Sequence, residues 1–168
     1  MLDKRGAVME AARRISSLLR ARHITGAVIG GVAVVLHGHV RTTRDVDVFV
    51  AGSTSEFRPI LEAEGASFNA SRKEFLVDEI PVHLVGPEMA LPTPTHFVDI
   101  EDVATVSLAD LINLKLHSGT RNVTRAQDIA DVIGLIRFHS LNASFASKIQ
   151  KSLRPEFRKL VAAVKKER

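Results

Sequence analysis

Two aspartates lie one residue apart in an otherwise apolar stretch, Asp45-Val-Asp-Val-Phe-Val50. The alternation of side chains predicts a β-strand, which places Asp45 and Asp47 on the same face. Two carboxylates on one face repel each other, and burial adds a desolvation cost of several kcal/mol per ion. A bound divalent cation removes both costs, and Mg²⁺ or Mn²⁺ suits such oxygen ligands. The pair therefore predicts a metal site, and the alternative is an exposed edge strand with solvated aspartates.

Two glycines, Gly30 and Gly31, precede this pair, with thirteen residues between Gly31 and Asp45. They are expected at a turn from a strand near 24–29 into a short helix over 32–37. With no side chains there, a triphosphate can approach, and the backbone N–H groups favour anions. Two dications about 3.5–4 Å apart can stabilise the attacking and leaving oxygens of a nucleotidyl transfer. The combination predicts chemistry on a nucleoside triphosphate.

The spacing Gly30-Gly31, thirteen residues, Asp45-x-Asp47 resembles the signature of the DNA polymerase β-like nucleotidyltransferase superfamily. The segment HGHVRTTRDVD is similar to bacterial AbiEii-type nucleotidyltransferases, some of which are toxins of type IV toxin–antitoxin pairs. The segment LINLKLHSGTRNVTRAQDIADVIGLI also resembles that group, in which a helical lysine precedes an Asp-x-x-Asp helix. The resemblance covers about residues 24–138. It implies Mg²⁺-dependent transfer of a nucleoside monophosphate from an NTP to an acceptor hydroxyl of RNA, tRNA or protein.

The resemblance also implies roles for individual residues, with Asp45 and Asp47 as the metal ligands. Nucleotide contacts are expected from the glycine pair, the following loop and two later helices: Gly30, Gly31, Thr43, Arg44, Lys115 and Asp128. Lys115 lies on the apolar stripe of its helix, so it either reaches the triphosphate or forms a structural ion pair with Asp128 or Asp131. Arg44, like Arg41, either touches phosphates or balances the carboxylates.

One position departs from the family pattern. Where these enzymes have a third carboxylate, in a Val-Asp-Leu pattern, this chain has Val82-His83-Leu84. A neutral imidazole can ligate a metal or act as a base, so His83 is expected in the catalytic set with Asp45, Asp47 and Lys115. It does not supply the negative charge of a carboxylate. The alternative is therefore a catalytically degenerate relative that binds a nucleotide or a partner protein.

The remaining pattern predicts the α+β class: a small mixed sheet flanked by helices, nucleotidyltransferase-like, followed by a helical C-terminal part. Helices are expected over 3–22 and 53–64, strands over 24–29, 45–50, 71–77 and 80–85, and a Pro-rich crossing loop over 86–96. Capping boxes at Ser107-x-x-Asp110 and Thr124-x-x-Gln127 begin two helices. A last helical region begins at Asn142 and restarts at Pro155. We expect one compact unit, with a core over 1–106 and a helical region over 107–168 packed on it.

Composition limits the setting. The 168 residues, 45% hydrophobic and 25% charged, are typical of a globular chain with one core. No apolar run approaches the roughly 18 residues of a membrane span. The absence of cysteine excludes disulfides and fits the cytoplasm, and the charged N-terminal stretch has no apolar signal core.

Basic residues concentrate at the two ends of the chain. Residues 1–22 hold six Lys and Arg against two acidic residues, and residues 148–168 hold eight against two. Such ends suit an RNA or tRNA acceptor, or an acidic partner such as an antitoxin or regulator protein. The alternative is an ordinary solvated helix surface. The histidines His37 and His39, with Asp45, leave a transition-metal site as a further alternative.

Overall fold

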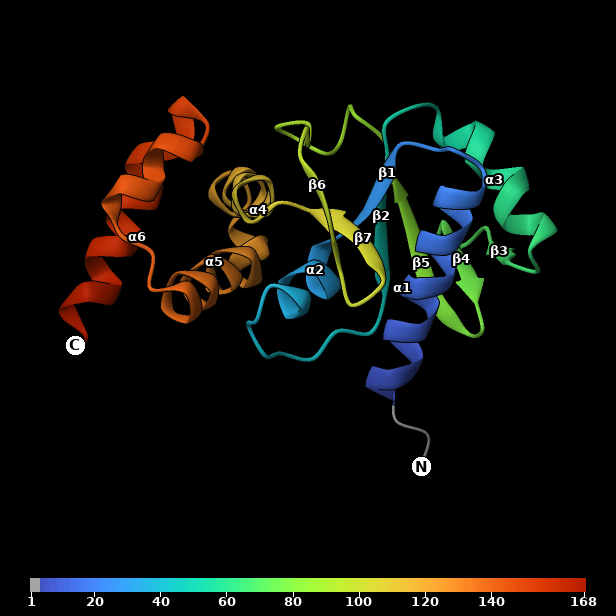
Figure 1. Ribbon diagram of the computed structural model, residues 1–168, viewed down its shortest axis with the longest axis horizontal. Helices are drawn as coiled ribbons and strands as arrows, with labels where there is room; N and C mark the ends of the chain where they lie inside the picture. Colours follow the sequence, from blue (N-terminus) through green and yellow to red (C-terminus); the bar gives the residue numbers. More distant parts are fainter. Residues whose placement is uncertain (1–3) are drawn as a thin grey trace.

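The structure of the protein is a computed structural model that describes residues 4–168 (Figure 1). Its centre is a seven-stranded mixed sheet with the order β3-β4-β5-β2-β1-β7-β6. The strands are β1 (Gly26–Ile29), β2 (Val46–Val50), β3 (Ser67–Asn69), β4 (Glu74–Val77), β5 (Ile80–Val85), β6 (Phe97–Ile100) and β7 (Val103–Val106). The α-helices are α1 (Lys4–Ala21), α2 (Gly30–Leu36), α3 (Thr54–Ala63), α4 (Leu108–Arg121), α5 (Ala126–His139) and α6 (Arg154–Lys166). Three 3-10 segments are η1 (Val123–Arg125), η2 (Ala143–Lys148) and η3 (Lys151–Leu153).

Strand pairing at the centre of the sheet brings the two predicted motifs together. β2 runs antiparallel to β1 and parallel to β5. The register pairs Asp47 with Ile29 on one side and with His83 on the other. Because directly opposed residues project to the same face, Asp47 and His83 share one face of the sheet. β2 begins at Val46, so Asp45 precedes the strand rather than opening it as predicted.

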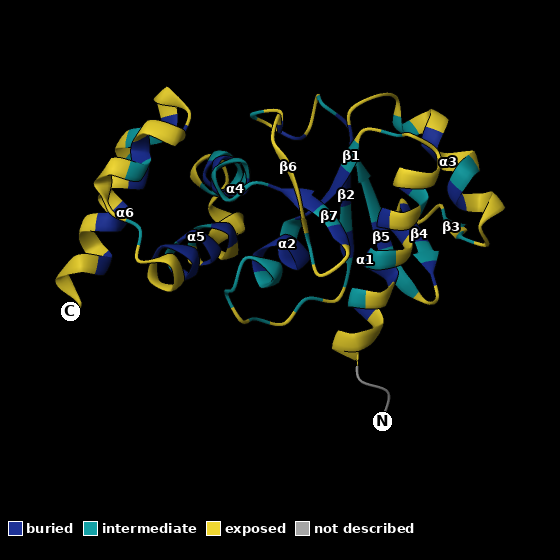
Figure 2. Cartoon of the chain, in the orientation of Figure 1, coloured by how far each residue is buried: buried dark blue, intermediate teal, exposed yellow. Residues whose placement is uncertain are grey.

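Helices cover both faces of this sheet. On one face, α1 and α3 pack on alternate strand residues such as Val28 and Val48. The helix expected over 3–22 is present as α1, which turns an apolar face to the sheet. Leu18 is partly buried on this face, and four residues are fully buried: Val8, Ala12, Ile15 and Leu19. On the other face, the residues beside Asp47 and His83 face α4, and α5 and α6 extend the same core (Figure 2).

The predicted α+β class is confirmed: a mixed sheet is flanked by helices and followed by a helical C-terminal part. Buried Phe157 and Val161 of α6 belong to the same core cluster as Ala27 and Phe49 of the sheet. The division of the chain between residues 106 and 107 stays a prediction. None of the helices within residues 4–168 is both long and apolar enough to cross a membrane.

Three strands correct the sequence prediction, which has four strands and none after residue 85. β3 has only three residues, and β6 is an exposed edge strand with no buried alternating face. β7 is short and is fixed by a parallel pairing with the distant β1, a long-range contact that local periodicity does not report. The predicted irregular loop over 86–96 is confirmed. The strand predicted over 71–77 begins later, at Glu74.

One of the two predicted capping boxes is wrong. At α4, Ser107 Oγ accepts the N–H of Asp110 at 3.2 Å, as expected. Before α5, the cap is Asn122, whose Oδ1 accepts the N–H of Thr124 at 3.0 Å. The chain then forms η1, and α5 begins only at Ala126. Asparagine side chains readily accept the N–H of the residue two positions later. Asn122 therefore forms the turn with Thr124, and the threonine does not serve as the cap.

The last helical region follows the prediction. Asn142 caps η2, its Oδ1 accepting the N–H of Ser144 at 2.9 Å. Pro155 lies in the first turn of α6, where the missing N–H costs nothing.

Candidate functional site

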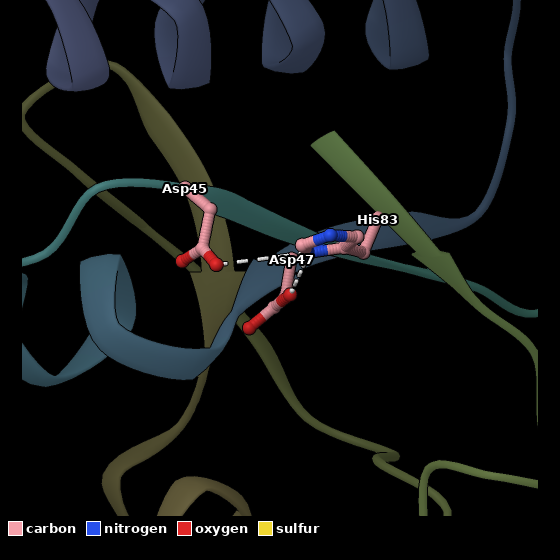
Figure 3. Close-up of side chains that lie close together, drawn as sticks. All are labelled: Asp45, Asp47 and His83. Carbon is pink, nitrogen blue, oxygen red and sulfur yellow. Dashed lines mark hydrogen bonds and ion pairs between the residues drawn. The ribbon is translucent and has the colours of Figure 1, made fainter. Parts of the chain in front are cut away.

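Three side chains converge where β2 begins beside β5 (Figure 3). His83 Nδ1 lies 3.1 Å from Asp47 Oδ1 and 3.8 Å from Asp45 Oδ2. One possible ligand atom from each of the three residues lies within 4.8 Å of the others. Two carboxylates and one imidazole form a donor set that divalent cations accept in proteins. The structure thus brings together three of the sequence-predicted catalytic residues, including the one that departs from the family pattern.

The charges of these groups explain why a cation suits the cluster. Burial, followed by the nearby charge of Asp47, raises the pKa of Asp45 above its ordinary value of 3.8. The hydrogen bond to Asp47 raises the pKa of His83 to about 9, burial opposes this shift, and a second hydrogen bond to Glu74 adds to it. Without a metal, an imidazolium therefore supplies the positive charge between the carboxylates. A dication bound there would do the same for both aspartates.

Glu74 is a residue of this cluster that the sequence analysis does not single out. Only 7% exposed, it places its Oε2 3.0 Å from His83 Nε2. A local signal does exist, because β4 alternates so that Glu74 and Leu76 face away from the buried Phe75 and Val77. The signal is weak without the pairing of β4 with β5, which places Glu74 opposite His83, one position beyond the pair Phe75–Val82.

The structure shows a steric reason for the glycine pair beside the one expected. Gly30 has φ +66°, and a Cβ there would lie 2.2 Å from Asp47 Oδ2. A Cβ on Gly31 would lie 2.7 Å from Thr43 Oγ1 and 2.8 Å from a guanidinium nitrogen of Arg41. Side chains of Asp47, Thr43 and Arg41 thus lie where a Cβ on either glycine would be. A contact from Gly30 or Gly31 to a triphosphate stays a prediction.

A cleft of about 340 Å³ opens beside Asp47. Gly30, Lys115 and Asp128 also line it. Apolar residues of β5, of the loop after it and of α4 complete the wall: Val85, Met89, Ala90, Leu91, Leu111 and Leu114. Arg125 lines the same cleft and was missed, since nothing in its local sequence separates it from the neighbouring polar residues. The cleft has the size expected for a small-molecule site, whose range begins near 300 Å³.

Lys115 lies in a buried charge network next to the cleft. Its Nζ lies 2.9 Å from Asp128 Oδ1 and 2.9 Å from Asp131 Oδ2. Asp128 also receives the Nε of Arg125 at 2.9 Å. Asp131 Oδ1 lies 2.8 Å from the Nε of Arg41. This contact joins the loop that precedes Asp45 to α5. The structural ion pair considered for Lys115 is present with both aspartates, and nucleotide contacts from Lys115 and Asp128 stay predictions.

The loop residues Thr43 and Arg44 lie just before Asp45 of the candidate metal site, in different environments. Thr43 Oγ1 donates to the carbonyl oxygen of Asp45 at 3.4 Å, which ties the loop to the start of β2. Arg44 is exposed. Its side chain is therefore accessible to a ligand, and phosphate contacts from Thr43 or Arg44 stay predictions.

The transition-metal alternative with His37 and His39 is not supported. His37 Nε2 lies 2.8 Å from the carbonyl oxygen of Val106, and burial lowers the pKa of His37. The ring of His39 packs against Gly134 of α5. Within residues 4–168, the group that could hold a metal contains neither histidine.

The bridge made by His83 predicts a pH-dependent stability of the metal-free protein. The pKa of His83 in the folded protein, about 9, exceeds its ordinary value of 6.5. The protonated ring therefore stabilises the fold fully below pH 6.5, and this contribution is lost as the pH rises through 9. The side chain is 35% exposed. Because solvent screens a side chain this exposed, we expect the free energy of unfolding to fall by only about 1 kcal/mol over this pH range. Thermal unfolding in excess chelator should show the decline, and His83→Gln should remove it. An identical decline in that variant would contradict the assignment.

Comparison with known proteins agrees with this geometry. Residues 7–163 match the family described as "Nucleotidyltransferase of unknown function (DUF6036)". The fold is similar to that of an antigenic nucleotidyltransferase-like protein from Paracoccidioides brasiliensis, with a TM-score of 0.60 and 16% identity over 96% of this chain and 88% of that one. At this identity the similarity shows the fold alone. Among curated proteins, no relative matches the sequence significantly. The predicted resemblance to nucleotidyltransferases is thus confirmed, and the narrower AbiEii type is not. The chain belongs to the DUF6036 nucleotidyltransferase family.

Proposed function

We propose that the protein is a metal-dependent nucleotidyltransferase that transfers a nucleoside monophosphate from an NTP to an acceptor hydroxyl. The observation that supports this most strongly is the convergence of Asp45, Asp47 and His83 at the edge of a cleft. A catalytic metal site needs an open side where substrate can meet the ion, and Asp47 belongs both to the cluster and to the cleft wall.

Asp45 and Asp47 would hold Mg²⁺ or Mn²⁺, with His83 as a nitrogen ligand through Nδ1. The raised pKa of Asp45 supports this assignment, because it reports carboxylate repulsion and burial that a cation offsets. Imidazole favours softer ions than Mg²⁺, so Mn²⁺ is the expected preference. A bound dication would neutralise phosphate charge and polarise the phosphoryl group under attack.

The cleft would position the nucleotide. Lys115 and Arg125 supply positive charge near the carboxylates, and Leu111, Leu114 and Met89 supply apolar surface for a base. The network that holds Lys115 also limits its movement, which favours a fixed phosphate contact over a flexible one. Thr43, Arg44, Gly30 and Gly31 border the metal from the other side in this proposal.

A second function is supported by the same histidine. The imidazolium of His83 joins Asp47 to Glu74, so these two carboxylates have a cationic partner within the chain itself. A catalytically degenerate nucleotidyltransferase-fold protein that binds a nucleotide or a partner protein fits this arrangement. Binding of NTP without transfer would identify it.

The decisive experiment incubates the protein with each α-labelled NTP, Mg²⁺ or Mn²⁺, and total RNA. Label on RNA supports transfer to an RNA or tRNA acceptor, and label on protein supports a protein acceptor. Absence of label from every product, together with saturable NTP binding, would show that the protein binds nucleotide without transferring it.

We propose a cytoplasmic setting for either function. An adjacent gene for a small regulator would support a toxin role of the AbiEii type.

The basic residues near the C-terminus are the proposed RNA contact. At the other end, Arg13, Arg14 and Arg20 contact acidic side chains or backbone oxygens of the chain itself. Lys148 and Lys151 are exposed beside a groove of about 900 Å³. Deletion of residues 148–168 would remove the buried Phe157 and expose the core, so point substitutions are the appropriate test.

Changing both lysines to glutamine should weaken RNA binding and reduce the slope of log K against log salt by about 1 per lysine, because each phosphate contact releases counterions. Fluorescence anisotropy with labelled tRNA over a salt series measures both quantities. The matched control replaces Lys73, an exposed lysine on the turn before β4. Unchanged affinity and slope in the double variant would exclude this surface as the RNA contact.

A further inference from the structure

Glu74 is a buried carboxylate whose place in the fold is explained by one neighbour. Within residues 4–168, the structure shows one hydrogen bond to the side chain of Glu74, and it comes from His83 Nε2. Arg72, itself largely exposed, lies 4.0 Å away, beyond hydrogen-bonding distance. A carboxylate that is 7% exposed has lost most of its hydration and needs such a partner.

The three adjacent strands β4, β5 and β2 place Glu74, His83 and Asp47 in one row across the sheet. The imidazole therefore lies between two carboxylates and uses one nitrogen for each. Nδ1 faces Asp47 and Asp45, the proposed metal ligands, and Nε2 faces Glu74 on the buried side. A ring that ligates through Nδ1 must carry its proton on Nε2, and a buried carboxylate is the acceptor that holds it there.

We propose that Glu74 is a positioning residue that acts through His83: it accepts Nε2–H, fixes the ring orientation and leaves the Nδ1 lone pair directed at the metal site. The inference rests on the proposed metal site and deepens it. Carboxylate–histidine pairs of this kind make imidazole a stronger ligand, and their loss typically weakens metal binding 10–100-fold.

The direct test measures Mn²⁺ affinity by the electron paramagnetic resonance signal of free Mn²⁺, at one pH, for the full-length protein. Glu74→Leu removes both acceptor and charge and should weaken binding by about 10–100-fold. Glu74→Gln keeps an acceptor oxygen and the side-chain shape, so its loss should be smaller. Glu79→Gln is the matched control, because Glu79 is exposed on the turn of the same hairpin, and it should leave the affinity unchanged.

A double-mutant cycle separates a role through His83 from a direct effect of charge. In a His83→Ala background, Glu74→Leu should cause no further loss of Mn²⁺ affinity, because the residue that Glu74 orients is gone. A second loss of equal size would overturn the positioning role. Circular dichroism and thermal unfolding confirm that each variant is folded, and the nearly isosteric Glu74→Gln remains informative if Glu74→Leu is not.

A spectroscopic readout reports the ring itself. With saturating Mg²⁺, two-bond ¹H–¹⁵N correlations of His83 should show the proton on Nε2 in both the parent protein and Glu74→Leu. The Nε2–H should exchange with water faster in Glu74→Leu, because it has lost its hydrogen-bond acceptor. Mn²⁺ binding of equal strength in the parent and in Glu74→Leu would overturn the role of Glu74 and leave the metal site intact. Failure of the parent to bind Mn²⁺ or Mg²⁺ would instead remove the metal site, and this inference with it.

Discussion

Asp47→Ala is expected to weaken Mn²⁺ binding by more than about 100-fold and to abolish metal-dependent nucleotidyl transfer, since a direct ligand contributes more than the residues that orient ligands. Within residues 4–168, Asp47 is the residue shared by the cleft wall and the candidate metal site of Asp45, Asp47 and His83. Among residues 4–168, the nearby carboxylates are already engaged. Asp45 belongs to the cluster, Glu74 lies on the far side of His83, and Asp128 is paired with Lys115 and Arg125.

Thermal unfolding gives the same test without a substrate. Mn²⁺ at about 100 times its Kd should stabilise the parent protein by about 2.7 kcal/mol, which raises the melting temperature by roughly 5–10 °C for a chain of this size. Asp47→Ala should lose this gain, whereas Asp78→Ala, which removes an exposed carboxylate at a hairpin turn, should keep it. Equal stabilisation of Asp47→Ala and the parent would show that Mn²⁺ binds elsewhere.

The part of the site that the sequence predicts follows from local rules. Alternation places Asp45 and Asp47 together, and the hairpin pattern places His83 on a face opposite to its apolar neighbours. Both inferences need only the period of a strand. The contact between the two elements is less local, because it depends on the parallel pairing of β2 with β5, which the register shows.

The parts that were missed depend on partners distant in sequence. Glu74 looks like an ordinary polar residue until β4 is paired with β5, and its burial follows only from that pairing. β7 is likewise held by its contact with β1, about 75 residues earlier in the chain, and packs under α1. The glycine pair lies at the predicted turn, whereas the closeness of Asp47 and Thr43 to it required atomic positions.

Lys115 shows why spacing alone left two alternatives open. Its position on the inner stripe of α4 predicts burial, and a buried lysine needs either a ligand or an acidic partner. The structure supplies two acidic partners from one turn of α5, since Asp128 and Asp131 are three residues apart. These contacts compensate two buried carboxylates, so the lysine has a structural role whatever its contact with phosphate.

Lys115→Met should therefore destabilise the fold by about 3–5 kcal/mol, because it leaves two buried carboxylates without their shared cation. Burial by itself raises the pKa of Asp128, and the hydrogen bond and charge of Lys115 reverse this to a net lowering, so the lysine is the main source of compensation. Thermal unfolding should show a decrease of roughly 6–20 °C. Lys148→Met, at an exposed lysine, is the matched control and should change little.

The double variant Lys115→Met with Asp128→Asn distinguishes the structural role from a phosphate contact. Removing one charge of each sign restores the balance around Asp131, which keeps Arg41 and Gln127, so most of the lost stability should return. Affinity for an NTP, measured by calorimetry with Mg²⁺, should remain weak in this folded variant if Lys115 also binds the triphosphate. Parental NTP affinity in the rescued variant would restrict Lys115 to the ion-pair network, and unrecovered stability would show that the two buried aspartates do not act as one unit with the lysine.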